Sequence, residues 1–363
     1  MFSNAFSLCT RSSRIFTRLN LKQKLSAVNK IPLTKNNVFP SSKRSLVTEA
    51  IGIDKINSHI FRSKELLIMH GSKGVYGGQI VGQALLAASQ TIDPKYHVNS
   101  LHSYFTFPGD NRIPIYYHVE EIRNGRMFSS RIVHAKQNNK IIFSMTCSFQ
   151  VPMESNLVHQ NVMPIVQAPE NYPQKLSSEG NRHLFEMKED GQYDMKTKIG
   201  KIEAECRFIG HPDTNVQHRE LSDSALSPYL LWWYKATGDL SKESNFVHQS
   251  AVAYHSDYQL VYTSLLPHKV GSRSEREFLK MMVSLDHCVW FHAPVRGDEW
   301  LLYQMESHRA SSSRVLLTGK LFNMQGDLVA SIVQEGLMKS SDTVIEKLDP
   351  KTISTMPPSL ISK

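Results

Sequence analysis

The fold is decided by a stretch of sequence that the chain carries twice. Residues 102–120 read HSYFTFPGDNRIPIYYHVE, and residues 287–306 read HCVWFHAPVRGDEWLLYQME. Each copy has a histidine, aromatic residues, a proline and a Gly-Asp pair, followed by aliphatic and aromatic residues that end in glutamate. Alternation of this kind is typical of a β-strand. Two such copies far apart in one chain predict a repeated structural unit.

The similarity continues downstream of each copy. SSRIVHAKQNNKIIFSMTC, at 129–147, resembles SSRVLLTGKLFNMQGDLVASIVQ, at 312–334, beginning with the shared Ser-Ser-Arg. In each segment a polar turn, NN or QGD, separates two apolar strands. Both halves of the chain are therefore expected to contain antiparallel strands.

An apolar helical segment precedes these strands in each half. The first is GGQIVGQALLAASQTI, at 77–92, and its counterpart is SAVAYHSDYQLVYTSLL, at 250–266, which includes Asp257. The Gly-Gly start could suggest a phosphate-binding loop, but no Gly-Lys-Ser/Thr follows it, and tight packing of a helix against a sheet explains the glycines better. A helix followed by antiparallel strands, twice, predicts two α+β units.

These patterns divide the chain into five parts. The segment between the two units is rich in Pro, Glu, Asn and Ser and is expected to be a mostly irregular linker over the surface. The second unit opens with the strand-like segments IEAECRFIG and SPYLLWWYKAT. The parts are a basic tail expected to be cleaved (1–48), a first unit (50–150), a linker (151–198), a second unit (199–342) and a C-terminal tail (343–363).

The N-terminal tail carries all of the chain's excess charge. The net charge is +9, yet residues 1–48 hold nine Lys or Arg and no Asp or Glu, so the rest of the chain has 33 of each sign. A basic, acid-free, Ser-bearing and amphipathic segment predicts a mitochondrial transit peptide and a location in the matrix. A basic arm that binds nucleic acid or membrane is the alternative for the tail, and peroxisomes are the alternative location, although the C-terminal SLISK differs from a Ser-Lys-Leu address.

Other compositional features exclude several protein classes. The neutral main part of the chain gives no sign of nucleic-acid binding, and no apolar run approaches the roughly 20 residues that cross a bilayer. Four widely spaced cysteines, without metal-ligand spacing, predict neither disulfides nor a zinc site; they are Cys9, Cys147, Cys206 and Cys288. We expect no metal and no cofactor.

The stretch VSLDHCVWFH, at 283–292, places polar residues within an apolar strand. Strict alternation puts Ser284 and Asp286 on one face and His287 on the other, so that His287 and His292 point apart and make a poor metal pair. Asp286 and His287 are expected to make structural hydrogen bonds where the strand begins.

At these residues the chain resembles the type II acyl-CoA thioesterases, in which two hotdog units occupy one chain. The resemblance covers about residues 53 to 340. It implies an α+β double hotdog in which each unit is a long helix wrapped by an antiparallel sheet. It also implies hydrolysis of fatty acyl-CoA to fatty acid and coenzyme A, and a homo-oligomer. The resemblance rests on VYGGQIVGQALLAA, SLHSYFTFPGD, FSSRIVHAKQNNKIIFSMTCSFQ, the helix around Asp257, LDHCVWFH, GDEWLLYQMES and VASIVQEGLM.

The resemblance further implies a water-activating triad in the second half. Carried over position by position, the triad is Asp257, Ser284 and Gln334. The chemistry is reasonable, because a thiol leaving group with a pKa of about 8.5 needs little help from a general acid. Asp257 would accept the proton of a water molecule, while Ser284 and Gln334 would orient that water and the Gln amide would donate to the oxyanion. Because no Gly-x-Ser-x-Gly elbow is present, the serine is expected to orient water and not to form an acyl-enzyme.

Aligning the two copies gives a check that does not depend on the family. The first copy lacks the polar set of the second, as expected if a duplicated unit kept its site in one half. The aligned pairs are Gln334 with Cys147, Ser284 with Asn99, His287 with His102, and Asp257 with residues 81–83.

Two other functions remain open from the sequence. Hotdog folds also host enoyl-CoA hydratases and dehydratases, which would need a catalytic histidine beside an acid on the site face. A non-catalytic acyl-CoA-binding protein is the second alternative. Arg131 and Arg314, from the paired Ser-Ser-Arg segments, could meet coenzyme A phosphates or could be ordinary surface arginines.

Overall fold

The computed structural model describes residues 47–69, 71–175, 179–188, 192–210, 226–268 and 279–341. All of them belong to one compact unit, Arg44–Lys363. The predicted targeting tail lies outside the described residues except for Val47 and Thr48, which begin the short helix α1 (Val47–Ala50). The predicted C-terminal tail also lies outside them.

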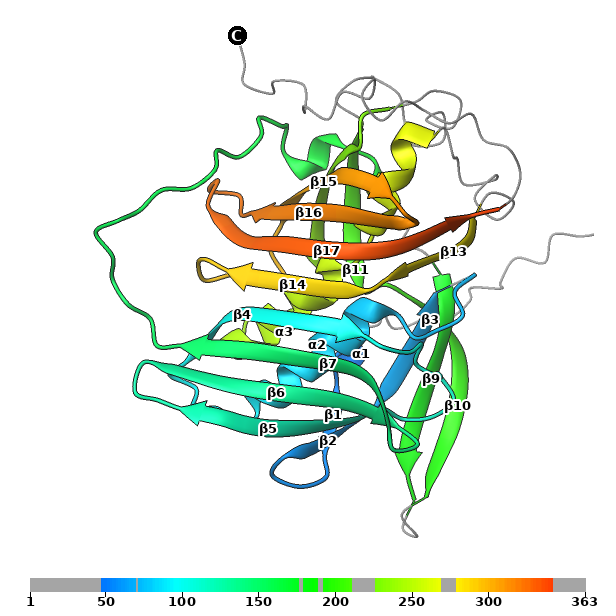
Figure 1. Cartoon of the computed structure of the whole chain (residues 1–363). Coiled ribbons are helices and arrows are strands. Elements are labelled where there is room, and N and C mark those ends of the chain that lie inside the picture. Colours follow the sequence, from blue (N-terminus) through cyan, green and yellow to red (C-terminus); the bar gives the residue numbers. More distant parts are fainter. Residues whose placement is uncertain are drawn as a thin grey trace, which may run out of the picture. The chain divides into compact units, whose positions relative to one another are not determined.

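An antiparallel sheet of 14 strands runs through the described residues (Figure 1). Its first half has the order β1-β2-β5-β6-β7-β4, and its second half has the order β14-β17-β16-β15-β12-β11-β8, with β13 also paired to β17. The strands of the first half are β1 (Ile53–Lys55), β2 (Ile60–Ser63), β4 (His97–Phe105), β5 (Tyr116–Asn124), β6 (Phe128–Gln137) and β7 (Lys140–Gln150). Those of the second half are β8 (Gln174–Lys175), β11 (Ala204–Gly210), β12 (Tyr229–Ala236), β13 (Leu279–Ser284), β14 (Asp286–Phe291), β15 (Leu301–Ser311), β16 (Arg314–Phe322) and β17 (Leu328–Ser340).

The two halves join where β4 pairs with β14, with Leu101 opposite Val289. Each half supplies one long helix, α2 (Gly77–Ser89) or α3 (Asn245–Ser256), and a short 3-10 helix, η3 (Val261–His268), follows α3. Both long helices share one hydrophobic core with the inner faces of the strands and lie behind the sheet in Figure 1. The predicted arrangement of a helix wrapped by an antiparallel sheet, twice, is confirmed.

Glycines let α2 and α3 pack backbone to backbone. A Cβ on Gly78 would lie 2.2 Å from the carbonyl oxygen of Tyr254, and a Cβ on Gly82 would lie 3.0 Å from that of Ser250. Residues four apart share a helix face, so Gly78 and Gly82 form the contact strip. The prediction that the Gly-Gly start serves packing on the sheet holds for Gly77, whose Cβ would lie 3.1 Å from the ring of Phe105 in β4, whereas Gly78 packs against α3 instead.

The predicted linker is only partly irregular. Residues 179–198 were expected to be irregular, but β9 (Glu179–Met187) and β10 (Tyr193–Lys201) form a hairpin that pairs with β3 (Glu65–Met69) in a separate three-stranded sheet. The predicted start of the second unit, at residue 199, falls inside β10. Most side chains of β10 are exposed, so its sequence lacks the apolar alternation that would have marked a strand.

A buried arginine fastens this hairpin to both halves. Arg182 of β9 forms ion pairs with Glu65 of the first half and Glu203 of the second, and all three side chains are buried. The hydroxyl of Tyr254 donates to the other carboxylate oxygen of Glu203 at 2.6 Å. Buried charges require such partners, because their desolvation is otherwise uncompensated.

The irregular part of the linker covers an outer face of the sheet. The indole N–H of Trp233 donates to the carbonyl oxygen of Gln167 at 3.1 Å, beside the 3-10 helix η1 (Pro169–Asn171). Met163, Val166 and Tyr172 pack on a second apolar cluster, formed by Tyr229, Leu231, Trp233, Leu302 and Phe322. This part lies over the surface, as predicted.

Within the part of the chain that the structure describes, no helix has the length and apolarity needed to span a bilayer.

Candidate active site

Asp257 lies where the two helices meet. It is the C-cap residue of α3, and its side chain is half-buried. Oδ1 accepts hydrogen bonds from Ser284 Oγ and Gln334 Nε2, each at 3.0 Å, and Oδ2 accepts one from the backbone N–H of Gly78 at 2.9 Å. Gly78 lies in the first turn of α2, where backbone N–H groups have no partner within the helix. One carboxylate is thus held by residues of both halves.

Two tyrosines fix the end of α3 that carries Asp257. Tyr76 donates its hydroxyl to the carbonyl oxygen of Tyr254 at 2.8 Å, and Tyr303 donates to that of Ser256 at 2.6 Å. Burial is the main cause that raises the pKa of both phenols, and the negative charge of Asp257 adds to it. The hydroxyls therefore keep their protons and satisfy carbonyl groups that the helix end leaves open.

Ser284 reaches the site because the strand carries an extra residue. Ser284 pairs with Gly336 and Cys288 pairs with Val333, so four steps along β13 and β14 match three steps along β17. Leu285 sits at this interruption, and a one-residue shift of register reverses the facing of every later side chain. Strict alternation across 283–292 was therefore wrong: Ser284 and His287 share the inner face.

Gln334, from β17, completes the predicted set and is fully buried. Its Nε2 donates to Ser284 Oγ at 2.7 Å as well as to Asp257 Oδ1, while Ser284 Oγ donates to that same carboxylate oxygen. Three residues from α3, β13 and β17 thus form a closed triangle of hydrogen bonds. The structure brings together all three of the residues that the resemblance implied.

His287 is a neighbour of this triangle that the sequence interpretation assigned to the opposite face. Its ring is completely buried, with Nδ1 2.6 Å from Gln334 Oε1 and Nε2 2.8 Å from Ser256 Oγ. Gly78 was also missed as a site residue, since glycine carries no side-chain signal. For His287, the apolar residues around it in the sequence indicate that the side chain is buried, but they do not indicate on which face of the strand it lies.

Comparison with known proteins now identifies the family. The model for the acyl-CoA thioesterase N-terminal domain matches residues 68–150, and the acyl-CoA thioesterase model matches residues 204–337. The acyl-coenzyme A thioesterase 8 of Rattus norvegicus is 35% identical over 83% of this chain and 91% of that protein. The chain belongs to the acyl-CoA thioesterase family. This confirms the predicted family and, with it, the predicted enzyme class.

Further relatives of this acyl-CoA thioesterase agree with its fold. The peroxisomal acyl-coenzyme A thioester hydrolase 1 of Saccharomyces cerevisiae is 30% identical over 73% of this chain and 86% of that protein. The crystal structure of acyl-CoA thioesterase II TesB2 from Mycobacterium marinum superposes with a TM-score of 0.62 at 30% identity, covering 83% of this chain and 99% of that one. A protein with a hot dog fold from Alicyclobacillus acidocaldarius, at 17% identity and a TM-score of 0.59, covers 81% and 98% and supports the fold alone.

The first half of the thioesterase has equivalent positions without the set of polar groups hydrogen-bonded to one another. Gln90 is the C-cap residue of α2, as Asp257 is the C-cap residue of α3. In the second half the pair Ser284 and Gly336 lies directly before the extra residue, and in the first half the pair Val98 and Phe149 lies directly before the same kind of one-residue irregularity. The predicted alignment of Asp257 with residues 81–83 was therefore wrong, and the alignments of Ser284 with Asn99 and of His287 with His102 were wrong by one residue. The equivalent pairs are Asp257 and Gln90, Ser284 and Val98, His287 and Leu101, and Gln334 and Cys147.

The alignment of His287 with His102 was wrong because the two histidines lie on opposite faces of the sheet. His102 is exposed on the outer face, with its ring 5.0 Å from that of Trp290, whereas His287 is buried inside. The predicted alignment of Cys147 with Gln334 agrees with the structure. Burial raises the pKa of the Cys147 thiol to about 12. Its sulfur is therefore an inert part of the core.

The paired arginines of the thioesterase also differ in exposure, but in the opposite sense. Arg131 is buried, and its guanidinium donates to Thr91 Oγ1 at 2.8 Å and to the Thr91 carbonyl oxygen at 2.9 Å. It closes the end of α2 and cannot meet a coenzyme A phosphate, so the phosphate interpretation was wrong for this residue. Arg314 is exposed and donates to Glu335 at 3.0 Å.

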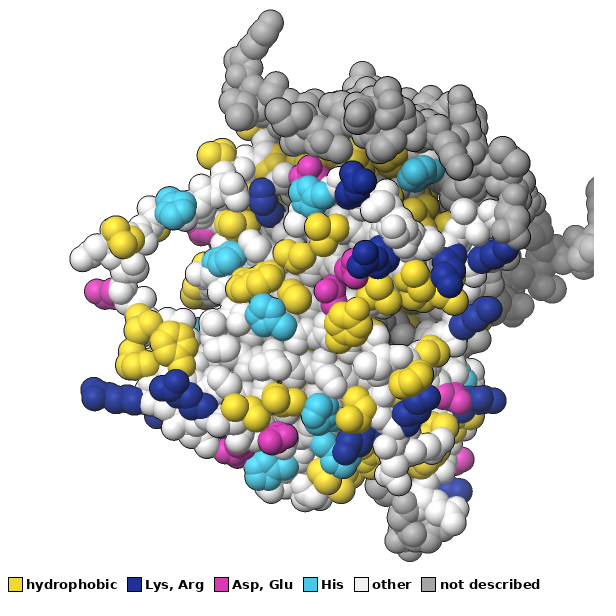
Figure 2. All heavy atoms as spheres, in the orientation of Figure 1, with side chains coloured by type: hydrophobic (Ala, Val, Ile, Leu, Met, Phe, Trp, Pro, Cys, Tyr) yellow, Lys and Arg dark blue, Asp and Glu magenta, His cyan; other side chains and the backbone are white. Residues whose placement is uncertain are grey.

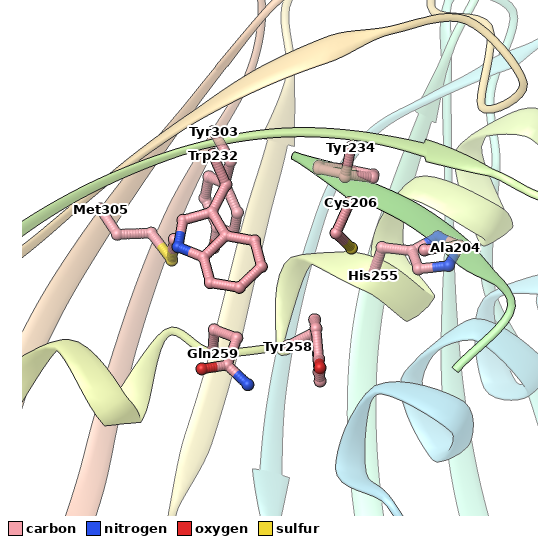
Figure 3. A pocket seen from close by; sticks show the side chains of 9 residues that line it. All are labelled: Ala204, Cys206, Trp232, Tyr234, His255, Tyr258, Gln259, Tyr303 and Met305. Atoms are coloured by element: carbon pink, nitrogen blue, oxygen red, sulfur yellow. The ribbon is translucent and has the colours of Figure 1, made fainter. Parts of the chain in front are cut away.

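An apolar pocket opens beside the segment that follows Asp257 (Figure 3). It is a small, partly open hollow between β11, β12, β15 and the end of α3. Tyr303 borders both this pocket and the catalytic side of α3, because its hydroxyl bonds Ser256. The lining residues are Ala204, Cys206, Trp232, Tyr234, His255, Tyr258, Gln259, Tyr303 and Met305.

Among the residues that the structure describes, no group of three or more His, Cys, Asp or Glu is placed to hold a metal ion.

Proposed function

We propose that this chain hydrolyses fatty acyl-CoA to free fatty acid and coenzyme A, with Asp257, Ser284 and Gln334 acting on a water molecule. The observation that carries the proposal is the triangle of hydrogen bonds among these three side chains. A carboxylate, an alcohol and an amide held within 3.0 Å of one another can position one water and accept its proton.

The two carboxylate oxygens have different tasks in this mechanism. Oδ1 of Asp257 is occupied by Ser284 and Gln334, whereas Oδ2 accepts only the N–H of Gly78. A thioester carbonyl oxygen that takes this N–H frees Oδ2 to accept the proton of the attacking water. The water oxygen then bonds to the carbonyl carbon, and negative charge moves to the carbonyl oxygen.

The first turn of α2 is suited to that charge. The N–H of Gly78, once the carbonyl oxygen has taken it from Asp257, and the positive end of the helix dipole stabilise an oxyanion there. Collapse of the tetrahedral intermediate breaks the carbon–sulfur bond and releases coenzyme A as a thiolate, which then takes up a proton. A thiol with a pKa of about 8.5 leaves without a strong acid.

Thiol release from palmitoyl-CoA by the full chain tests the proposal. Equal amounts of thiol and palmitate should form, and intact-mass spectra of rapidly quenched samples should show no acyl adduct, because Ser284 orients water. Ser284→Thr keeps a hydroxyl and should retain most activity, whereas Ser284→Ala should lose it. A folded protein that releases no thiol at any chain length would instead support the non-catalytic acyl-CoA-binding alternative, and an adduct on Ser284 would replace the water mechanism.

The hydratase alternative is not favoured by the site. It needs a catalytic histidine beside an acid, whereas both ring nitrogens of His287 are hydrogen-bonded to the neutral groups of Gln334 and Ser256. The family matches favour hydrolysis as well.

The acyl chain is proposed to occupy the pocket of Figure 3. Its walls are mainly aromatic, with the thioether of Met305, and they include Tyr258 and Gln259, which directly follow Asp257 in the chain. Cys206→Phe would fill part of the pocket and shift the preference toward shorter chains, by about fourfold in kcat/KM per methylene excluded. Met324→Phe, at an exposed turn position outside the pocket, is the control. An unchanged chain-length profile in Cys206→Phe would place the acyl chain elsewhere.

The tail is proposed to direct the enzyme to the mitochondrial matrix. Its basic, acid-free composition supports this location, and the yeast relative named as peroxisomal supports the alternative. Imaging of a fluorescent fusion with and without residues 1–48 distinguishes the two. A truncated fusion that keeps the location of the full chain contradicts a targeting tail.

Self-association is proposed from apolar side chains on the outer face of the sheet. In Figure 2 they lie among charged and histidine side chains on the face that Figure 1 shows. Tyr104, Ile141, Val283 and Leu316 are between 37% and 50% exposed. Light scattering should give a mass that is a multiple of the chain mass of 41.3 kDa, and a monomer at micromolar concentration would refute the proposal.

A further inference from the structure

The imidazole of His287 lies next to the catalytic triangle, on the side of Gln334 that faces away from Asp257. Gln334 separates it from Asp257: Nδ1 of the ring is 2.6 Å from Gln334 Oε1, and the other face of that amide meets Asp257 and Ser284. On its far side the ring meets Ser256 Oγ at 2.8 Å. His287 and Ser256 are both completely buried. The ring therefore contacts the triangle only through the amide.

The amide orientation dictates where the ring proton lies. An ionised carboxylate only accepts hydrogen bonds, so the NH2 group of Gln334 must face Asp257 and its Oε1 must face His287. Oε1 is an acceptor as well, which requires a proton on Nδ1. Burial is the main cause that lowers the pKa of His287, so the ring is neutral and, with its proton on Nδ1, Nε2 can only accept. The single hydroxyl proton of Ser256 must then point to Nε2 at 2.8 Å and not to the Ala253 carbonyl oxygen at 2.9 Å, the other acceptor within its reach.

We propose that His287 is a positioning residue that locks the Gln334 amide with its NH2 group toward Asp257 and Ser284. Without a donor at Nδ1, the buried Oε1 of Gln334 would lose its hydrogen bond. The side chain would then turn toward another donor and draw its NH2 group away from Asp257 and Ser284. Ser256 fixes the ring in turn, since it lies directly before Asp257 on α3.

The other half of the molecule shows what the position holds when no such lock is needed. There the equivalents of His287 and Gln334 are Leu101 and Cys147, which pair across β4 and β7 and are buried. The same place in the fold therefore accepts a purely apolar pair. A buried, fully hydrogen-bonded imidazole is needed only in the second half, where the Gln334 amide must be held toward Asp257 and Ser284.

Substitution of His287 in the full chain tests this role, which rests on the proposed function of Gln334. His287→Leu reproduces the residue of the first half and should lower kcat by about 100-fold, the cost of a misplaced catalytic group, with KM within about twofold. His287→Asn places an amide N–H near the position of Nδ1 and should recover kcat to within about tenfold of the wild type. His102→Leu, on the outer face, is the matched control and should keep full activity.

The outcomes of these measurements decide the proposal. Recovery by Asn but not by Leu, with the pH profile of kcat unchanged in shape, supports it. Wild-type kcat in His287→Leu overturns it, as does an Asn variant that folds like the wild type but is as slow as Leu. Loss of one limb of the pH profile overturns it in favour of acid–base catalysis by the ring. If the Leu variant does not fold, Ser256→Ala serves instead: reduced kcat with unchanged KM supports the lock, and full activity refutes it. Failure of the proposed function itself is distinguishable, because Asp257→Asn would then remain active.

Discussion

The two halves of this chain share a backbone plan but differ in what fills it. Both halves place a helix C-cap, a one-residue strand irregularity and a buried strand pair at equivalent positions. In the second half these positions are polar and hydrogen-bonded to one another; in the first they hold Val98, Leu101, Cys147 and an exposed Gln90. The fold therefore does not require the polar set, and its presence in one half points to chemistry.

The first half nevertheless takes part in the site. Its helix α2 supplies the N–H of Gly78 to Asp257, and the absence of a side chain at Gly78 allows the two helices to meet. A site that needs a carboxylate from one copy and a helix start from the other cannot be carried by either copy alone. Duplication in one chain keeps both parts together while allowing each copy to specialise.

The largest contrast is expected between the two C-cap residues. Asp257→Asn removes the proposed base, and kcat should fall by about 10²–10⁴-fold, the usual contribution of general base catalysis. Gln90→Asn, at the equivalent exposed position, should keep kcat within about twofold. Thiol release and circular dichroism on both variants check this. Equal losses of kcat in the two variants would contradict the functional difference between the halves.

A smaller effect is expected where the halves touch. Gly78→Ala puts a methyl group 2.2 Å from the Tyr254 carbonyl oxygen, so the helices must separate. We expect a loss of about 3 kcal/mol in the free energy of unfolding, as for severe overpacking, together with reduced activity. Urea denaturation measures the loss, and Gln90→Ala should stay within about 0.5 kcal/mol. An unchanged stability in Gly78→Ala would mean that the helix contact is looser than described.

The smallest expected difference between the halves is in how stability depends on pH. Two residues before their C-caps, α3 has the buried His255 where α2 has Ala88, and burial lowers the pKa of His255 to about 3. The unfolded chain binds a proton below about pH 6.5, while the folded chain stays neutral, so stability is lost as the pH falls from 6.5 toward 3 and the loss is about 2 kcal/mol by pH 5. His255→Asn should remove this part of the loss. Urea midpoints at pH 7 and pH 5 that fall equally in both proteins would contradict it.

The repeat could be read from the sequence because it rests on strong local signals. The Gly-Asp and Ser-Ser-Arg matches, with their alternating strands, predict two units, and the family resemblance implied all three members of the triangle. The exact register could not be read. A one-residue irregularity at Leu285 changes which face every later residue occupies, but it depends on pairing with β17 and leaves no mark in the local sequence.

The hairpin β9–β10 could not be predicted for a different reason. Most side chains of β10 are exposed and give no period-two pattern, and two of the buried residues of β9, Arg182 and His183, are polar. Its one decisive residue, Arg182, resembles a surface arginine in the sequence, because its carboxylate partners Glu65 and Glu203 are supplied by distant segments. A buried ion pair between remote parts of a chain has no local signature.

The position of Arg182 also has a consequence for cooperativity. Its one positive charge is shared by a carboxylate from each half, so both buried carboxylates lack this ion-pair partner until the hairpin is in place. Removing such a shared partner typically costs about 3–5 kcal/mol. The halves should therefore melt together, in a single calorimetric transition, and Arg182→Met should lower its midpoint; two separate transitions in the wild-type protein would show that the halves are thermodynamically independent.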